Sequence, residues 1–300
     1  MLPPHVLSPV RIQVDKNSKK ITGCLIACPM IAKTMLEKKA LAEKKVLRAA
    51  RLAVKVGAKI VGLGGFTSSV TDSGRTLSGK VNIAVTTGNS LTAAIAYLDI
   101  VTICRKLGTD YRAQRIAVVG ATGSIGYGLT KMLIKHRVKS LVLIGKTPSH
   151  MVELRNELRW VTKANITFST DIAAVKKADL VIMATASPGV VLSRPHLKIG
   201  AIVYDLTQPR NVAADITSGR NDLRLFSGGL VRTPGVWHKL ATGLPAGVNF
   251  ACLTETMLLA LEGDTHDYTG RVQVENIERI LRVLKKYHFT SALKASATAS

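Results

Sequence analysis

Cys252 is the side chain in this sequence best suited to nucleophilic chemistry. It lies in the first turn of a helix predicted from about Val248 to Glu262, where the helix dipole stabilises a thiolate. A thiolate is a strong nucleophile and a good leaving group, which suits acyl transfer. Taken alone, a cysteine on an apolar helix is more often an ordinary core residue. Glu255 shares the same helix face and is a second catalytic candidate, either assisting protonation or binding a neighbouring backbone group.

A glycine-rich turn provides the clearest binding signal. Ile116–Val119 is a β-branched run typical of a buried parallel strand, and helical periodicity follows from Tyr127. Because glycine lacks a Cβ atom and the N–H groups of the next helix point outward, a pyrophosphate can approach such a turn closely. The alternative is a turn used only for tight packing. The predicted cofactor-binding residues of the turn are Gly120, Ala121, Thr122, Gly123, Ser124, Ile125 and Gly126.

The residues after the second predicted strand, Ser140–Ile144, indicate which nucleotide is bound. An NAD-specific site usually places Asp or Glu there to bind the ribose 2′-hydroxyl. Here Lys146 and Thr147 follow the strand, and they suit a 2′-phosphate, so we expect NADPH as the cofactor. Further cofactor contacts are expected at the ends of later strands, at Ala184, Thr185 and Asp205.

Two polar loops are candidates for substrate binding. The predicted strands Lys59–Leu63 and Val81–Val85 each end in a loop rich in Gly, Ser and Thr. Ligands of open α/β sheets bind beyond the carboxyl ends of the strands, so these loops are expected to form a site. The candidate substrate residues are Phe66, Thr67, Ser68, Thr87, Gly88 and Asn89.

The order of strands and helices predicts an α/β protein. A doubly wound parallel-sheet (Rossmann) NADP domain is expected over residues 111–240, because six short strands alternate with helices there. A smaller N-terminal α/β substrate domain is expected over residues 1–110, beginning with a hairpin whose turn is Asp15–Lys19. C-terminal helices over residues 241–289 are expected to cross back to the cleft, and residues 290–300 form a tail predicted to be disordered.

The composition favours an acidic partner. Of the 300 residues, 42 are Lys or Arg and 19 are Asp or Glu, which gives a net charge of +23 and predicts attraction to nucleic acid, anionic membrane, an acidic protein or phosphate-rich ligands. Much of this charge falls on one predicted helix that carries Lys38, Lys39, Lys44, Lys45, Arg48 and Arg51, although a solvated helix face would look the same. The four scattered cysteines predict neither disulfides nor a metal site. With no signal peptide and no long apolar run, we expect a cytoplasmic protein; a homo-oligomer is compatible with the sequence.

Several blocks of residues together resemble the long-chain acyl-[acyl-carrier-protein] reductases of the cyanobacterial, aldehyde-forming type. The blocks occur in order and are spread from about Ile21 to His288. They are Leu63-Gly-Gly-Phe-Thr-Ser68, Thr86-Thr-Gly-Asn-Ser-Leu-Thr-Ala93, Ala117-Val-Val-Gly-Ala-Thr-Gly-Ser-Ile-Gly126, Ser227-Gly-Gly-Leu-Val231 and Phe250-Ala-Cys-Leu-Thr-Glu-Thr-Met-Leu-Leu259 with Glu262-Gly263. The glycine block alone is generic, whereas the others in combination are specific. The chain resembles a shorter, more basic relative of that family.

The resemblance implies a two-step reduction. The family's cysteine takes the acyl group from its carrier thioester, and NADPH then releases a fatty aldehyde. The matching block assigns the cysteine's role to Cys252, in place of the core-packing alternative. An acyl carrier protein or acyl-CoA is then the expected acidic partner, and nucleic acid is not expected.

Three other functions remain open on the sequence. Glutamyl-tRNA reductase is a rival because Asp205-Leu-Thr-Gln-Pro-Arg210 echoes its DxxxPR pattern, but that family's Cys-Asn-Arg context is absent here. A simple NADP-dependent dehydrogenase of the shikimate or methylene-tetrahydropterin type, without covalent catalysis, is the second. A non-enzymatic NADP-binding or nucleic-acid-binding protein is the third.

Overall fold

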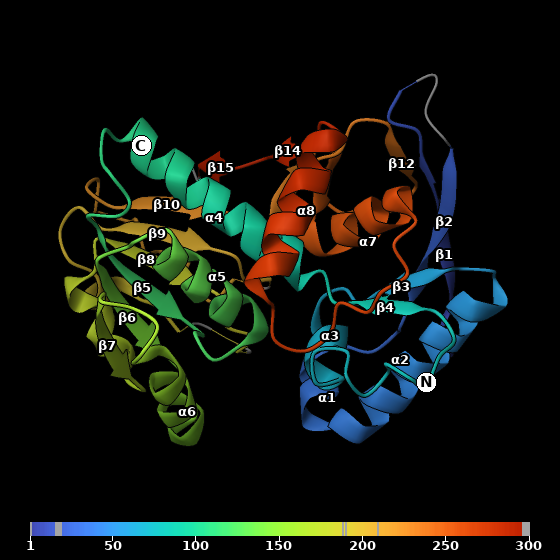
Figure 1. The fold of residues 1–300 in the computed structure, drawn as a ribbon, viewed down its shortest axis with the longest axis horizontal. Coiled ribbons are helices and arrows are strands. Elements are labelled where there is room, and N and C mark those ends of the chain that lie inside the picture. Colours follow the sequence, from blue (N-terminus) through green and yellow to red (C-terminus); the bar gives the residue numbers. More distant parts are fainter. Residues whose placement is uncertain (1, 16–19, 188, 190, 209, 296–300) are drawn as a thin grey trace. The chain divides into compact units, whose positions relative to one another are not determined.

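The computed structural model describes residues 2–15, 20–187, 189, 191–208 and 210–295 (Figure 1). The chain divides into two compact units. Unit 1 comprises Met1–Thr92 and Leu230–Ala292, and unit 2 comprises Ala93–Gly229 and Leu293–Ser300. The chain therefore leaves unit 1 within helix α4 (Asn89–Lys106) and returns to it after Gly229. Among the described residues, no helix is sufficiently long and apolar to cross a membrane.

Unit 2 is built on a seven-stranded sheet with the strand order β15-β10-β9-β8-β5-β6-β7. Every neighbouring pair is parallel except the edge pair of β10 and β15. The strands are β5 (Arg115–Val119), β6 (Ser140–Ile144), β7 (Asn165–Ser169), β8 (Leu180–Met183), β9 (Ile202–Asp205), β10 (Arg224–Ser227) and β15 (Lys294–Ala295). The intervening helices are α5 (Ser124–Lys135), α6 (Pro148–Leu158) and the short 3₁₀ helices η1 (Ile172–Lys177) and η2 (Arg194–His196). This arrangement confirms the predicted doubly wound α/β fold.

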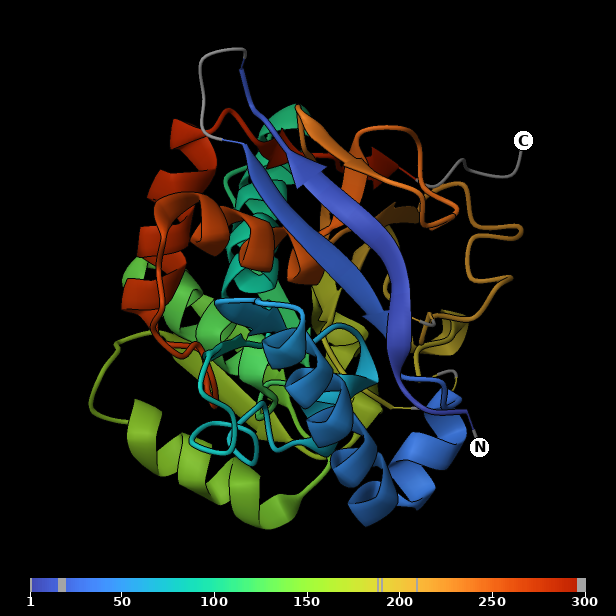
Figure 2. The same cartoon turned by 90° about the vertical axis from the view of Figure 1, so that its right-hand side faces the viewer.

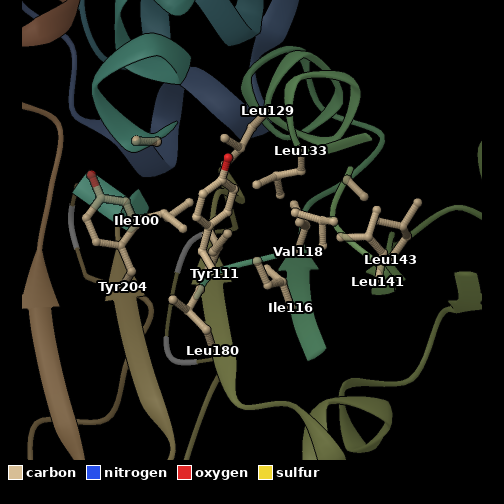
Figure 3. Packing of buried hydrophobic residues seen from close by; sticks show 14 of the residues in the cluster. Ile100, Tyr111, Ile116, Val118, Leu129, Leu133, Leu141, Leu143, Leu180 and Tyr204 are labelled. Atoms are coloured by element: carbon tan, nitrogen blue, oxygen red, sulfur yellow. The ribbon is translucent and has the colours of Figure 1, made fainter. Parts of the chain in front are cut away.

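The sheet of unit 2 is buried on both faces because its central strands are continuous apolar runs. Along β5, Ile116 and Val118 belong to one buried cluster, and Ala117 and Val119 belong to another. This division follows from the two-residue period of a strand. Figure 3 shows the first cluster, in which Ile100, Leu129 and Leu133 of the flanking helices pack against β5, β6 and β8.

Unit 1 begins with two antiparallel strands, β1 (His5–Ile12) and β2 (Ile21–Ala27), which lie side by side in Figure 2. β12 (Val236–His238) pairs with the other edge of β1. The pairing of β1 with β2 is the one expected for the predicted hairpin. Residues 16–19 of its predicted turn lie outside the described residues.

Over its described residues, the rest of unit 1 contains two further small sheets and five helices. β3 (Ile60–Gly62) and β4 (Ala84–Thr86) are parallel, and a bridge between Thr86 and Tyr268 extends them. β11 (Leu230–Arg232) lies between β13 (Val248–Phe250) and β14 (Thr290–Ser291). The helices are α1 (Ala32–Glu37), α2 (Lys39–Lys55), α3 (Phe66–Val70), α7 (Ala251–Glu262) and α8 (Val274–Lys286). α7 and α8 belong to unit 1, together with the N-terminal part of the chain. Their expected position at a cleft stays a prediction.

The observed boundaries differ from those expected at residues 110 and 240. α4 is one continuous helix, and its residues Ile100 and Ile103 are part of the unit 2 core, so the division falls at Thr92. At the second boundary, β11 pairs only with strands of unit 1, so the division falls before Leu230. Part of the tail expected to be disordered forms two short strands, β14 and β15. β14 pairs with the edge of β11, and β15 pairs with the edge of β10. Residues 296–300 lie outside the described residues.

Candidate active site

Cys252 is the second residue of α7, directly after β13. The predicted helix from Val248 therefore starts later, at Ala251, because Val248–Phe250 pair with β11. The side chain of Cys252 is partly exposed. Burial raises the pKa of the thiol above its ordinary value, hydrogen bonds from the backbone N–H groups of Gly65 and Leu253 lower it, and the negative charge of Glu255 raises it. The net result is a raised pKa, so in the free protein burial outweighs the helix-terminal stabilisation of a thiolate expected from the sequence.

Two glycines, Gly62 and Gly88, allow α7 to lie directly on the ends of β3 and β4. A Cβ atom at Gly88 would lie 2.2 Å from the Cα atom of Cys252, and one at Gly62 would lie 1.9 Å from Oγ1 of Thr256. At Gly64 the nearest atom would be a side-chain carbon of Leu253, at 3.5 Å. Gly88 also has a positive φ of 72°, which other residues rarely adopt. The two glycine-containing loops and the first two turns of α7 therefore form one packed assembly around Cys252.

Glu255 lies at the centre of this assembly and is fully buried. One carboxylate oxygen accepts a hydrogen bond from the Thr86 hydroxyl, and the other lies 2.6 Å from the backbone nitrogen of Leu91, in the first turn of α4. Burial raises the pKa of the carboxyl group, whereas these hydrogen bonds and the N–H groups of Gly88 and Ser90 lower it. Of the two roles considered for Glu255 from the sequence, its contacts are those of the second, namely binding neighbouring backbone.

The loops predicted to bind substrate lie beside the same helix end. Thr67 donates from its hydroxyl to the carbonyl oxygen of Gly64 (2.7 Å), and Thr87 donates to that of Tyr268 (3.2 Å). These two hydroxyls therefore hold the loops in place. Phe66 packs against the unit 1 core, Ser68 is buried in α3, and Asn89 is the first residue of α4. Substrate contact by these residues stays a prediction.

His238, on the chain before this site, has a structural partner. Nε2 of His238, on β12, lies 2.7 Å from Oδ1 of Asn249, and the amide of Asn249 donates to the Thr233 hydroxyl at 2.7 Å. His238 thus joins β12 to β13, the strand that precedes Cys252.

The glycine turn of unit 2 has the geometry of a dinucleotide site. Gly120 has φ of 91°, and a Cβ atom there would lie 2.6 Å from the carbonyl oxygen of Ala184 at the end of β8. At Gly126 a Cβ atom would lie 2.2 Å from the carbonyl oxygen of Gly120, so α5 packs closely on the turn. Gly123 is the N-cap of α5, which begins at Ser124, and the dipole of this helix favours an anion at its N-terminus.

Lys146 and Thr147 follow β6 next to this turn. A Cβ atom at Gly145 would lie 3.0 Å from a side-chain carbon of Thr122, which shows how close the two loops are. Lys146 is exposed, and Thr147 is the N-cap of α6. An exposed lysine beside the glycine turn has the charge that a 2′-phosphate requires.

Asp205 at the end of β9 has one carboxylate oxygen without a partner. Its Oδ1 accepts from the backbone nitrogen and hydroxyl of Thr207 (2.9 and 2.6 Å), whereas its buried Oδ2 has no donor among the residues that the structure describes. Burial raises the pKa of Asp205. Asn211 lies in the same polar run but was not among the residues expected to bind the cofactor. The Asn211 amide donates to the carbonyls of Ser187 (2.7 Å) and Gly189 (2.6 Å) and so joins the loops after β8 and β9.

The sheet and glycine turn of unit 2 are those of a Rossmann-type NAD(P)-binding unit of the oxidoreductase class. The family model described as shikimate / quinate 5-dehydrogenase matches residues 102–227, which lie within unit 2. Together with the glycine-turn geometry and the unpartnered oxygen of Asp205, this match supports the predicted binding of NADP(H).

Similarity to two known proteins extends over both units. The chain is 28% identical over 296 residues to the long-chain acyl-[acyl-carrier-protein] reductase of Synechococcus elongatus, covering 93% of this chain and 84% of that protein. It is 27% identical over 273 residues to the aminotransferase PigE of a Serratia species, covering 89% of this chain but only 32% of that protein, so the chain spans about a third of PigE. Among solved structures, shikimate 5-dehydrogenase from Listeria monocytogenes is 14% identical with a TM-score of 0.39, covering 67% of this chain and 64% of that one.

Proposed function

We propose that this protein reduces an acyl thioester to an aldehyde with NADPH, through a thioester formed on Cys252. The observation that carries the proposal is the position of Cys252 at the start of α7, facing the backbone N–H groups of Gly65 and Leu253. Similarity to the acyl-[acyl-carrier-protein] reductase over 93% of this chain supports the same activity.

In the first step, the sulfur of Cys252 attacks the acyl carbonyl carbon. A new carbon–sulfur bond forms, the bond to the carrier sulfur breaks, and the carrier leaves as a thiol with the proton lost from Cys252. Since burial raises the pKa of Cys252, the thiol is protonated before the substrate binds. The N–H groups of Gly65 and Leu253 would stabilise the sulfur as negative charge develops on it.

NADPH supplies the hydride that converts this thioester to an aldehyde, which restores the Cys252 thiol with one proton from solvent. The turn from Gly120 to Gly126 would bind the pyrophosphate, since its glycines carry no Cβ atom and it leads directly into the N-terminus of α5. Lys146 and Thr147 would bind the 2′-phosphate. Asp205, through its unpartnered Oδ2, is a candidate acceptor for the nicotinamide amide.

An acidic acyl carrier protein is the proposed donor, and acyl-CoA is the alternative donor. The exposed residues of α2 and of the turn before it provide a basic face; these are Lys38, Lys39, Lys44, Arg48 and Arg51. Lys45 does not belong to this face, although the sequence grouped it there. It is buried, and its Nζ donates to the carbonyl oxygen of Pro29 at 2.5 Å.

The test is an incubation of the protein with acyl-carrier-protein thioester in the absence of NADPH. Intact-mass spectrometry should find one acyl group per chain, and peptide mapping should locate it on Cys252. Addition of NADPH should remove the adduct and release aldehyde. A protein that oxidises NADPH without ever carrying an adduct would instead be a simple dehydrogenase, the function that the shikimate / quinate dehydrogenase match in unit 2 favours.

A further inference from the structure

Glu255 joins three separate segments of unit 1. It lies on α7, one turn after Cys252, and it is fully buried. Its two carboxylate oxygens are bound by Thr86, at the end of β4, and by Leu91, in the first turn of α4. The loop between these partners contains Gly88, whose backbone lies against Cys252.

We infer that Glu255 is a positioning residue, which fixes the Thr86–Leu91 loop against Cys252 and transfers no proton in the reaction. Both carboxylate oxygens accept hydrogen bonds from groups of the loop, and the side chain is fully buried, so neither oxygen reaches the surface of the unit. A carboxylate at the N-terminus of α4 is also stabilised by that helix's dipole. The effect of this positioning on catalysis rests on the proposed function. The positioning itself rests only on hydrogen bonds within unit 1.

The Thr86–Leu91 loop is also held by hydrogen bonds to Tyr268, so two separate residues restrict its movement. The backbone nitrogen of Thr87 lies 3.2 Å from the carbonyl oxygen of Tyr268, and the Thr87 hydroxyl donates to the same oxygen. Asp264 accepts a hydrogen bond from the Tyr268 hydroxyl at 2.6 Å and so fixes that partner. Removal of the bonds to Glu255 would therefore release only one side of the loop.

The test compares Glu255→Gln, Glu255→Ala and Thr86→Val with Glu262→Gln. Glu262 lies on the same helix and is bonded to Lys286 and Tyr287 near its end, so its change removes one charge from α7 without touching the loop. Thr86→Val removes one hydrogen bond to Glu255 but keeps the carboxylate. It replaces the Glu255 variants in the test if those variants do not fold.

The first readout is hydrogen–deuterium exchange in the peptide that contains residues 86–92. Thr86→Val should exchange faster there, by about tenfold for the loss of one charge-assisted hydrogen bond. Glu255→Ala, which loses the bonds to both Thr86 and Leu91, should exchange faster still. Glu262→Gln should exchange like the wild type. Unchanged exchange in Glu255→Ala would overturn the positioning role.

The second readout is the rate of Cys252 alkylation by iodoacetamide against pH, followed by peptide mapping. Glu255→Gln should shift the profile to lower pH, because the carboxylate charge that opposes the thiolate is gone, and Glu262→Gln should not. An unshifted profile in Glu255→Gln would contradict a negatively charged Glu255 carboxylate near Cys252, and with it the positioning role. This readout needs no acyl substrate, so it stands even if wild type forms no acyl adduct, which would overturn only the proposed function.

The third readout is the rate of acyl transfer in the same variants. Loss of a general acid costs about 10²- to 10⁴-fold, whether the replacement is Gln or Ala. A positioning residue should behave differently: Glu255→Gln, which keeps an oxygen acceptor and the same size, should retain far more activity than Glu255→Ala. Equal and complete loss in both variants, with both folded, would assign proton transfer to Glu255.

Discussion

The backbone of Gly88 lies directly against the backbone of Cys252, and a Cβ atom at Gly88 would come within 2.2 Å of the Cys252 Cα atom. Backbone atoms cannot move aside in the way that the end of a flexible side chain can. The two loops that follow β3 and β4 and the start of α7 therefore have a fixed relationship. The glycine at position 88 is required by this contact as well as by its positive φ.

Gly88→Ala should displace the first turn of α7. We expect a loss of stability of roughly 2 kcal/mol or more, since a strained φ and a steric clash act together, and a loss of acyl transfer because Cys252 moves. Gly79→Ala is the matched control: Gly79 has φ of 77° but nothing within 4 Å of its Cβ position. Thermal unfolding should separate the two variants, and equal effects would show that the clash at Gly88 is relieved at no cost.

Gly120→Ala should weaken NADPH binding, because the new methyl group would lie 2.6 Å from the carbonyl oxygen of Ala184 and force the turn open. Gly108→Ala provides the control in the same unit, since Gly108 has φ of 68° and open space around it. Fluorescence titration with NADPH gives the affinity. Normal NADPH binding in Gly120→Ala would mean that the cofactor lies elsewhere.

Unit 2 could be predicted from the sequence in far more detail than unit 1. Runs such as Leu180–Met183 are apolar at every position, so they identify buried parallel strands without knowledge of their neighbours. No local pattern reveals that Glu255 binds Thr86, which is 169 residues away, or that the hydroxyl of buried Tyr204 donates to Asp99 on α4 at 2.6 Å. The sequence shows the Ser227–Val231 block as a motif but does not show why it contains glycine. The cause is a tertiary contact, because a Cβ atom at Gly228 would lie 1.9 Å from the Tyr204 hydroxyl.

The sequence predicts which residue types could react or carry charge, but not the surroundings that set their pKa values and contacts. The helix position of Cys252 was evident from the sequence, but burial depends on which loops cover the thiol, and burial decides the direction of its pKa. Likewise, the charge of Lys45 counted toward a basic helix face, whereas the fold turns this side chain to the carbonyl oxygen of Pro29. Tertiary packing decides both cases.

Lys146→Ala should reduce the preference for NADPH over NADH. One charge-assisted contact to the 2′-phosphate is worth ~1.5–3 kcal/mol, which corresponds to about tenfold to a hundredfold in affinity. The affinity for NADH should stay the same, because it lacks that phosphate. Lys163→Ala, which changes another exposed lysine of unit 2, is the control. Equal affinities of the wild type for NADPH and NADH would contradict the role of Lys146.

Lys44→Glu combined with Arg48→Glu should slow the reaction with acyl carrier protein and leave a short neutral thioester unaffected. Both side chains are exposed on α2, and electrostatic steering by such residues falls with ionic strength, since the Debye length shrinks to about 3 Å at 1 M salt. Arg282→Glu combined with Lys285→Glu, both exposed on α8, is the matched change of charge elsewhere in unit 1. If the carrier-dependent rate of the α2 double variant equals that of the wild type at low salt, this face is only a solvated surface.

Cys252→Ser should keep NADPH binding, because the glycine turn belongs to unit 2, and should lose aldehyde formation by several orders of magnitude. An alkoxide is far harder to generate near pH 7 than a thiolate, so serine is a poor replacement nucleophile. The pKa of the wild-type thiol is raised, so the thiolate fraction, and with it the alkylation rate of the free protein, should still increase by about tenfold per pH unit between pH 7 and 8. Cys24→Ser, which changes a partly exposed cysteine on β2, is the control and should keep full activity. Reduction of the acyl thioester by Cys252→Ser at a near wild-type rate would exclude covalent catalysis. An adduct on another cysteine would move the nucleophile away from α7.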